Sequence, residues 1–365
     1  MRRLAAIAAA ALTLSGCVGG EEEGNGSAPA LPPRTPPSFV GIVSEDLLAG
    51  DAAYRRRMLS RQASVGIGLV RQTFHWDRIE RAPGRYYFGE YDSYVEALAR
   101  HGMELLPILF SPPDFRASGD RARGTPPPDR AADLGAFAAR LVERYGPRGS
   151  FWRERPRLRR RPIRAWQVWN EPNLPQYWPE GPDPGAYAEL LRATADGIRR
   201  ADPHAKVVSA GLSESRLGMP FRPFVTGMYE AGAGQAIDIF ALHAFARSAR
   251  GSLAAAESTR TLLDDLDQHP QIWVTEFGWA SGGPPSPFTT DEHGQADQVE
   301  AALRGLIERR EELGLRGAVY YSWRDALVYE GGQDFFGLHT GLLDIAGRPK
   351  PALEAFRSAA AAVRR

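Results

Sequence analysis

Residues 163–173 read IRAWQVWNEPN, and residues 272–279 read IWVTEFGW. Each stretch begins with apolar and β-branched residues that are typical of a buried strand. Each also places a glutamate, Glu171 or Glu276, at or just beyond the point where the apolar run ends. In a barrel of parallel strands, functional side chains come from the carboxyl ends of the strands. Whether these two glutamates share a site therefore depends on the fold of the whole chain.

Around these two stretches, short apolar runs alternate with longer amphipathic ones. Eight runs are interpreted as strands, namely residues 38–43, 66–71, 104–110, 163–169, 206–211, 237–243, 272–276 and 318–323. Eight stretches with helical periodicity follow them, namely residues 52–62, 91–100, 132–145, 186–201, 221–231, 253–266, 295–313 and 351–363. Such alternation indicates βα units around a parallel sheet whose strands are covered on both faces. We predict an α/β fold, a (β/α)8 TIM barrel, for residues 38–365.

A doubly wound open sheet is the alternative arrangement of βα units. That fold would place a Gly-rich, phosphate-binding turn after the first strand. The sequence at that position is Val43-Ser44-Glu45-Asp46, which contains no glycine. The barrel is therefore the preferred prediction.

Composition argues against several classes of function. Lys and Arg number 45 against 44 Asp and Glu, so there is no electrostatic attraction for nucleic acid, and we expect no such partner. The seven histidines show neither the His-x-His nor the His-Glu-x-x-His spacing of metal sites. Gly282 and Gly283 lie in a predicted loop that does not resemble a phosphate-binding turn. We therefore expect no metal and no cofactor.

The first 37 residues read as targeting and linking segments. Residues 1–17 combine a charged start with an apolar stretch too short to span a bilayer, and they end in Leu14-Ser15-Gly16-Cys17. That tetrad resembles the bacterial lipobox and predicts a lipoprotein signal peptide with lipidation at Cys17, the only cysteine. Residues 18–37 are rich in Gly, Glu, Ser and Pro and predict a disordered tether. We expect an exported monomer, held on the outer face of the cytoplasmic membrane or on the outer membrane by this lipid alone.

The two strand-end glutamates point to glycoside hydrolysis. That reaction needs two carboxyl groups, one to protonate the leaving oxygen and one to stabilise or attack the oxocarbenium-like centre. A single glutamate at a strand end is more often a solvated residue or an ion-pair partner. Here both are flanked by tryptophans, and sugar rings pack against aromatic faces. Because the two glutamates are 105 positions apart in the sequence (276 minus 171), only the barrel would bring them together.

The motifs resemble those of the large clan of (β/α)8 retaining glycoside hydrolases. Residues 169–173, WNEPN, match the clan's acid/base motif after strand four, and residues 275–279, TEFGW, match its nucleophile motif after strand seven. Within the clan, the chain is most similar to glycoside hydrolase family 39 and to family 5-like proteins. The closing segment of the family is similar to residues 337–338, 341–344 and 348–352 of this chain. The resemblance extends from residue 39 to residue 357.

The resemblance implies a role for five residues. Glu171 is the expected acid/base, and it must stay protonated near neutral pH through partial burial and the nearby charge of Glu276. Glu276 is the expected nucleophile, which Arg71 supports as a cation. Asn170 is expected to hydrogen-bond the sugar 2-hydroxyl, and His243 to contact the substrate.

Tryptophans are the expected sugar-binding surfaces. Trp323, at the end of the eighth predicted strand, is the expected platform beneath the sugar at the cleaved bond. Trp279 and Trp76 are further candidates for sugar contact, together with Trp178.

One position departs from the clan's pattern. Many relatives carry a tyrosine two residues after the histidine, where it donates a hydrogen bond to the nucleophile. This chain has Phe245 there, which lacks a hydroxyl group. Tyr320 and Tyr321, in the eighth predicted strand, are the candidate replacements.

The sequence thus predicts an enzyme, a retaining β-glycosidase that hydrolyses O-glycosidic bonds of a polysaccharide or oligosaccharide by double displacement. A catalytically inactive carbohydrate-binding or cell-envelope scaffold barrel is one alternative, because a fold alone does not prove activity. A transglycosylase, which passes the glycosyl group to another sugar, is a second. The sugar, the linkage and endo or exo action stay open.

Overall fold

The computed structural model describes residues 35–328 and 332–364, which belong to one unit of the chain. The predicted signal peptide, its Cys17 and nearly all of the predicted tether lie outside the described residues. Within the described residues, no helix has both the length and the apolar character that a bilayer span requires. The lipid anchor stays a prediction.

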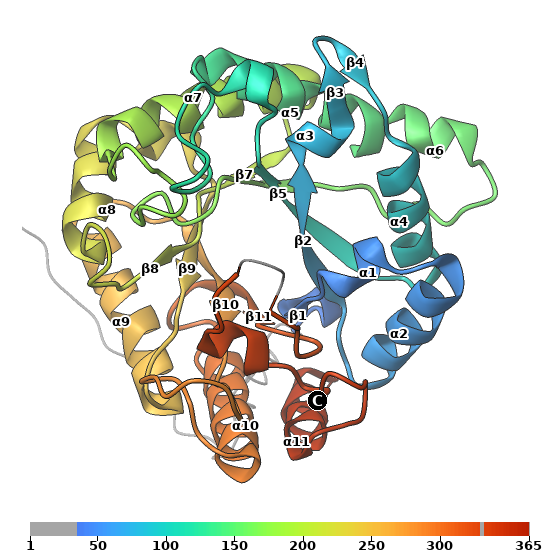
Figure 1. The fold of residues 1–365 in the computed structure, drawn as a ribbon, viewed down its shortest axis with the longest axis vertical. Coiled ribbons are helices and arrows are strands. Elements are labelled where there is room, and N and C mark those ends of the chain that lie inside the picture. The colour runs from blue at the N-terminus through green and yellow to red at the C-terminus, as the bar shows by residue number, and fades with distance from the viewer. Residues whose placement is uncertain (1–34, 329–331, 365) are drawn as a thin grey trace, which may run out of the picture. The chain divides into compact units, whose positions relative to one another are not determined.

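A closed barrel of parallel strands forms the centre of this unit (Figure 1). The eight strands are, in chain order, β1 (Val40–Val43), β2 (Leu69–His75), β5 (Glu104–Phe110), β6 (Ala165–Val168), β7 (Lys206–Val208), β9 (Ile239–His243), β10 (Gln271–Phe277) and β11 (Leu315–Tyr320). Each pairs in parallel with the next, and β11 pairs with β1 to close the ring. The predicted TIM barrel is confirmed.

Helices form an outer ring around the strands (Figure 1). They are α2 (Ala52–Ser64), α4 (Gly89–Arg100), α5 (Ala131–Tyr145), α7 (Pro184–Ala201), α8 (Phe221–Glu230), α9 (Ala249–Asp265), α10 (Glu292–Glu308) and α11 (Pro351–Ala360). Local sequence explains several starts: Asp183 accepts hydrogen bonds from the first backbone N–H groups of α7, and Asp291 does so for α10. Short helices α1 (Asp46–Ala49), α3 (Trp76–Ile79) and α6 (Ser150–Glu154) and a hairpin of β3 (Glu80–Ala82) and β4 (Arg85–Tyr86) complete the loops.

One predicted strand, residues 206–211, is interrupted in the structure. Strand β7 ends at Val208, because the Ser209 hydroxyl, in place of a backbone carbonyl, accepts the hydrogen bond of the Ala241 amide. Pairing with β9 resumes as the two-residue strand β8 (Leu212–Ser213). The irregular step between β7 and β8 lies at the carboxyl end of the barrel, next to the residues described below.

Two apolar layers hold the barrel together. Side chains inside the ring of strands form a small cluster of Val43, Leu69, Leu106, Val208, Ile239, Ala241, Trp273 and Val319. A much larger cluster fills the space between the strands and the surrounding helices. The ring is therefore a packed core that leaves only its ends free for polar side chains.

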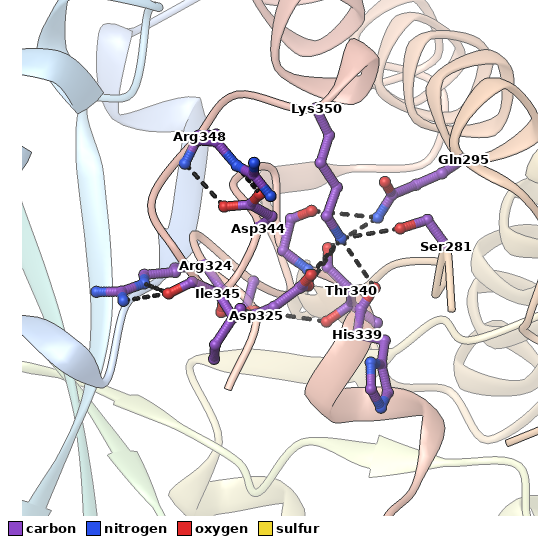
Figure 2. Close-up of polar contacts among 12 residues, drawn as sticks. Ser281, Gln295, Arg324, Asp325, His339, Thr340, Asp344, Ile345, Arg348 and Lys350 are labelled. Carbon is purple, nitrogen blue, oxygen red and sulfur yellow. Dashed lines mark hydrogen bonds and ion pairs between the residues drawn. The ribbon is translucent and has the colours of Figure 1, made fainter. Parts of the chain in front are cut away.

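The closing segment after β11 is fixed by a buried ion pair, Lys350 with Asp325, whose nearest nitrogen–oxygen distance is 2.6 Å. Figure 2 shows the Lys350 ammonium among oxygen acceptors, which also include the Ser281 hydroxyl at 2.9 Å. The Gln295 amide donates to the backbone carbonyls of Thr340 and Gly341 in the same region. These contacts tie the loops after β10 and β11 to the start of α11.

Replacing Lys350 by methionine is expected to lower the free energy of unfolding by about 3–5 kcal/mol, because Asp325 would lose its cationic partner in a site with little solvent. Arg348→Met is the matched control, since Arg348 pairs with Asp344 in the same segment but is mostly exposed. That change is expected to cost about 0–1 kcal/mol. Denaturant unfolding measures both variants, and equal losses would contradict the role assigned to Lys350.

Candidate active site

Both strand-end glutamates lie at the same end of the barrel, and one imidazole ring lies between them. Glu171 follows β6, and Glu276 belongs to β10. His243, at the end of β9, approaches Glu171 Oε1 with Nδ1 at 2.8 Å and Glu276 Oε1 with Nε2 at 3.4 Å. The two carboxylates are therefore separated by no more than one imidazole ring and two polar contacts.

Arg71, in β2, connects the nucleophile candidate to the rest of the site. Arg71 is 1% exposed, and its guanidinium donates from Nη1 to Glu276 Oε1 at 2.5 Å. It also donates from Nη2 to Asn170 Oδ1 at 3.0 Å and from Nε to Gln167 Oε1 at 2.8 Å. A buried guanidinium needs partners on all sides, and here those partners are residues of the site itself. The structure thus brings together the five polar residues named from the sequence.

The backbone of the WNEPN segment is unusual. Trp169 and Glu171 adopt φ angles of 73° and 40°, in the left-handed region that residues other than glycine rarely occupy. The Glu171 amide donates to the carbonyl of Gly211, and Asn173 Nδ2 donates to the carbonyl of Ser213. Strained backbone of this kind costs about 1–3 kcal/mol per residue and persists where the surrounding structure fixes it. The segment is therefore held so that the Glu171 side chain enters the mouth.

Gly211 belongs to the site although no sequence pattern singled it out. A Cβ atom at this position would lie 1.9 Å from Nε2 of His243. The His243 ring therefore packs directly on the Gly211 backbone, and only glycine leaves room for it there. The only sequence signal for Gly211 was its place at the end of a predicted strand, and that signal is weak.

The protonation of Glu171 differs from the sequence-based expectation. Burial raises the pKa of Glu171, but attraction to the charged form of His243, the hydrogen bond from that ring, and contributions from Ser213 and Arg71 outweigh burial. The net result is a pKa below the ordinary value of a glutamate. The expectation of a raised pKa for Glu171 was therefore wrong, because it overlooked the histidine between the two carboxylates.

Replacing His243 by asparagine is expected to move the alkaline limb of the kcat/KM profile to higher pH. A general acid acts in its protonated form, and the alkaline limb reports its pKa in the free enzyme. Because His243 lowers the pKa of Glu171, its removal raises that pKa and extends activity upward in pH. The exposed His269, which pairs with Asp264, provides the control His269→Asn. A limb that stays in place or moves to lower pH would contradict this assignment.

The four tryptophans named from the sequence are buried, although they were expected to be exposed to the substrate. Trp323 and Trp76 have no exposed surface, Trp279 is 1% exposed and Trp178 is 5% exposed. Trp76 donates its indole hydrogen to Glu80, and Trp279 donates to the carbonyl of Ala246. A buried indole presents no face to a sugar, so the expected platform role of Trp323 and the sugar contacts of the others do not fit this structure. They are packing residues.

Partly exposed tyrosines occupy the mouth instead. Tyr321, two residues before Trp323, and Tyr177, in the loop after β6, both retain exposed surface. Burial, followed by the charge of Glu276, raises the pKa of Tyr321, and burial followed by the charges of Glu171 and Glu276 raises that of Tyr177. Both phenol rings therefore lie within electrostatic reach of the carboxylates, and they are better placed than the tryptophans to pack against a sugar.

Neither tyrosine proposed to replace the missing hydroxyl is hydrogen-bonded to Glu276. The Tyr320 hydroxyl is buried and donates to the carbonyl of Thr340. The ring of Tyr321 packs edge to face with the ring of Phe245, with 6.1 Å between the ring centroids. Within the described residues, the groups in ion-pair distance of Glu276 are those of Arg71 and His243. The nucleophile candidate is thus supported by a guanidinium and an imidazole.

Among residues 35–328 and 332–364, no group of three or more His, Cys, Asp or Glu side chains is arranged to hold a metal ion. The chemistry of the mouth follows from its carboxylates, its guanidinium and its imidazole. A pair of carboxylates that approach one imidazole ring from opposite sides can act on a single bond, one as a proton donor and one as a nucleophile or charge stabiliser.

Solved structures with a similar fold include glycoside hydrolases. A family 39 glycoside hydrolase from the gut symbiont Bacteroides cellulosilyticus WH2 matches with a TM-score of 0.64 at 17% identity, over 89% of this chain and 64% of that chain. The fold of this chain is that of these enzymes. An exo-β-1,4-mannosidase from Opitutaceae bacterium strain TAV5 matches with a TM-score of 0.60 at 18% identity, over 88% of this chain and 59% of that one. This chain thus spans less than two thirds of the length of either.

A family 5 mannosidase from Rhizomucor miehei is similar along most of both chains, with 89% of this chain and 92% of that chain covered. Its TM-score is 0.57 and its identity 15%. Identities this low establish the shared barrel and do not transfer activity. No protein-family model matches the sequence, and no curated protein sequence matches it.

Proposed function

We propose that this protein is a retaining β-glycosidase that hydrolyses an O-glycosidic bond of a polysaccharide or oligosaccharide by double displacement. The observation that carries the proposal is the pair of carboxylates from β6 and β10 that approach opposite nitrogens of one imidazole ring. The ion pair of Glu276 with the buried Arg71 makes the two carboxylates unequal, as two different roles require.

In the first step, a Glu276 oxygen attacks the anomeric carbon, and the bond from that carbon to the leaving oxygen breaks. Glu171 gives its proton to the leaving oxygen, and a glycosyl ester forms on Glu276. Glu276 Oε1 is engaged by Arg71 and His243, which leaves Oε2 as the attacking atom. Asn170 Oδ1 accepts from Arg71, so its Nδ2 faces the substrate as a donor for the sugar 2-hydroxyl.

In the second step, the Glu171 carboxylate removes a proton from water as the water oxygen attacks the anomeric carbon. The ester bond breaks, Glu276 leaves as a carboxylate, and two inversions give net retention. During the first step the leaving group must displace the contact of His243 with Glu171, because the proton of Glu171 has to reach the leaving oxygen.

The proposal is tested with aryl and oligosaccharide β-glycosides of glucose, galactose, mannose and xylose. Proton NMR is expected to show the β-anomer as the first product, followed by slow mutarotation. The α-anomer as first product would contradict double displacement. Transfer products at high acceptor concentration would identify a transglycosylase, and failure to cleave any glycoside would favour the inactive scaffold.

We also propose that the protein is exported and anchored to the membrane through a lipid on Cys17. The support is the order of charged start, apolar stretch and lipobox-like tetrad in residues 1–17. Cys17→Ser is expected to move the protein from the membrane fraction to the soluble fraction of the producing cell. Unchanged membrane association would contradict the anchor.

A further inference from the structure

A third carboxylate, Glu45, lies at the same mouth. It follows β1, the strand that pairs with β11 on one side and β2 on the other. Its Oε2 accepts a hydrogen bond from Gln72 Nε2 at 2.5 Å, and its Oε1 accepts one from Thr73 Oγ1 at 3.3 Å. Both donors directly follow Arg71 in β2, so Glu45 is positioned by the strand that also supports Glu276.

Glu45 has no evident structural role. It occupies the residue before helix α1, yet its side chain makes no capping hydrogen bond to that helix. The ion pairs recorded for the described residues do not include it, and the nearby Arg71 is already bonded to Glu276, Asn170 and Gln167. Glu45 as a whole residue is exposed, whereas burial of its carboxyl group raises the pKa of Glu45.

Gln72, which donates a hydrogen bond to Glu45, lowers the stability of the fold, because one of its polar atoms is buried without a partner. Gln72 has no exposed surface, and its Oε1 lacks a hydrogen-bond partner while its Nε2 is used on Glu45. A buried polar atom without a partner costs about 1–3 kcal/mol, and such an arrangement calls for an explanation beyond packing. A carboxylate has about four acceptor positions, and donors on Gln72 and Thr73 fill only some of those on Glu45.

We propose that Glu45 is a specificity-determining residue that accepts hydrogen bonds from two hydroxyl groups of the sugar bound over Glu276, and that it selects uncharged sugars against uronic acids. This inference rests on the proposed glycosidase function and names the class of sugar. Both carboxylate oxygens keep acceptor capacity, which suits a pair of hydroxyl donors better than a single ammonium group. A negatively charged sugar would face Glu45, Glu171 and Glu276 with Arg71 already paired, and repulsion would exclude it.

The test compares wild type, Glu45→Gln and Glu45→Ala on matched aryl β-glycosides: a neutral hexoside, its monodeoxy analogues, the 2-amino sugar and the uronide. Removing the charged acceptor is expected to lower kcat/KM for the neutral sugar by about 10- to 100-fold. On a deoxy analogue that lacks one of the two recognised hydroxyls, Glu45→Ala is expected to lower kcat/KM by a smaller factor than on the parent sugar. Glu45→Gln is expected to lower the ratio of kcat/KM for the neutral sugar to kcat/KM for the uronide.

Binding of non-hydrolysable thioglycosides by calorimetry separates this inference from the proposed function. An inactive protein whose affinity for the neutral thioglycoside falls in Glu45→Ala would refute the glycosidase and keep the recognition role. An active enzyme whose kcat/KM is the same in Glu45→Ala for every sugar would refute the recognition role alone. A preference for the amino sugar or the uronide over the neutral sugar would also overturn it. Glu104→Ala, an exposed glutamate at the opposite end of β5, is the control.

Discussion

Replacing Glu276 by alanine is expected to lower kcat/KM for glycoside hydrolysis by about 10⁴- to 10⁶-fold. The variant lacks the oxygen that would attack the anomeric carbon, and no other carboxylate lies against Arg71 among the described residues. Steady-state kinetics on an aryl β-glycoside measures the loss. Added azide fits the space left by the side chain, so partial recovery of turnover is expected, with the α-glycosyl azide as product.

Two controls distinguish this loss from a failure to fold. Glu276→Gln keeps the volume of the side chain beside the buried guanidinium and is expected to lose activity to a similar extent. Glu104→Ala removes an exposed glutamate from the opposite end of the barrel and is expected to retain wild-type activity. A Glu276→Ala variant that keeps its thermal midpoint and more than about a tenth of wild-type turnover would exclude Glu276 as the nucleophile.

Replacing Glu171 by alanine is expected to divide substrates by their leaving groups. An unactivated oligosaccharide needs a proton on its leaving oxygen, so its kcat/KM is expected to fall by about 10²- to 10⁴-fold. The leaving group of a dinitrophenyl glycoside departs as a stable phenolate and needs little protonation. The rate at which this substrate forms the glycosyl ester is therefore expected to stay close to that of wild type. Pre-steady-state and steady-state kinetics on both substrates measure the difference.

The second step adds a further signature of Glu171. Without a general base the glycosyl ester on Glu276 is expected to accumulate, so the dinitrophenyl substrate gives a burst followed by slow turnover. Azide attacks this ester from the face that water would use, and the expected product is the β-glycosyl azide, opposite to that of Glu276→Ala. Equal losses on both substrates, or an α-azide product, would contradict the acid/base role.

The sequence predicted the barrel well because its strands are short, apolar and regularly separated by amphipathic helices. Each apolar run can be recognised from its own residues, and so can the end of the run, where Glu171 or Glu276 stands. Residues 206–211 were predicted as one strand, because the hydroxyl of Ser209 that interrupts the pairing looks ordinary in the sequence. Such a local exchange of partners is visible only once β9 lies alongside.

The aromatic surface of the site could not be read from the sequence. Trp323 and Tyr321 stand two residues apart at the end of β11, and either ring could serve as a platform. After the strand ends at Tyr320, the backbone amide of Trp323 bonds to the carbonyl of Val43, and the indole turns into the core. Which of two aromatic residues keeps an exposed face depends on these tertiary contacts and not on residue type.

Contacts between distant strands explain the other differences. The position of His243 between the two carboxylates requires β9 to lie beside β10 and Gly211 to leave room for the ring. The lowered pKa of Glu171 follows from that placement. Likewise, Glu45 reads as part of an ordinary loop until Gln72 and Thr73 are seen to hold it.

The central claim, that Glu276 carries the sugar as a covalent ester, is tested most directly by trapping that ester. A 2-deoxy-2-fluoro glycoside with a dinitrophenyl leaving group slows both steps and the second one more, so the intermediate accumulates. Mass spectrometry of the digested protein is expected to find one fluorosugar on the peptide that contains residues 271–277, attached to Glu276. A label on Glu171 or elsewhere, or full inactivation without any covalent label, would contradict the account.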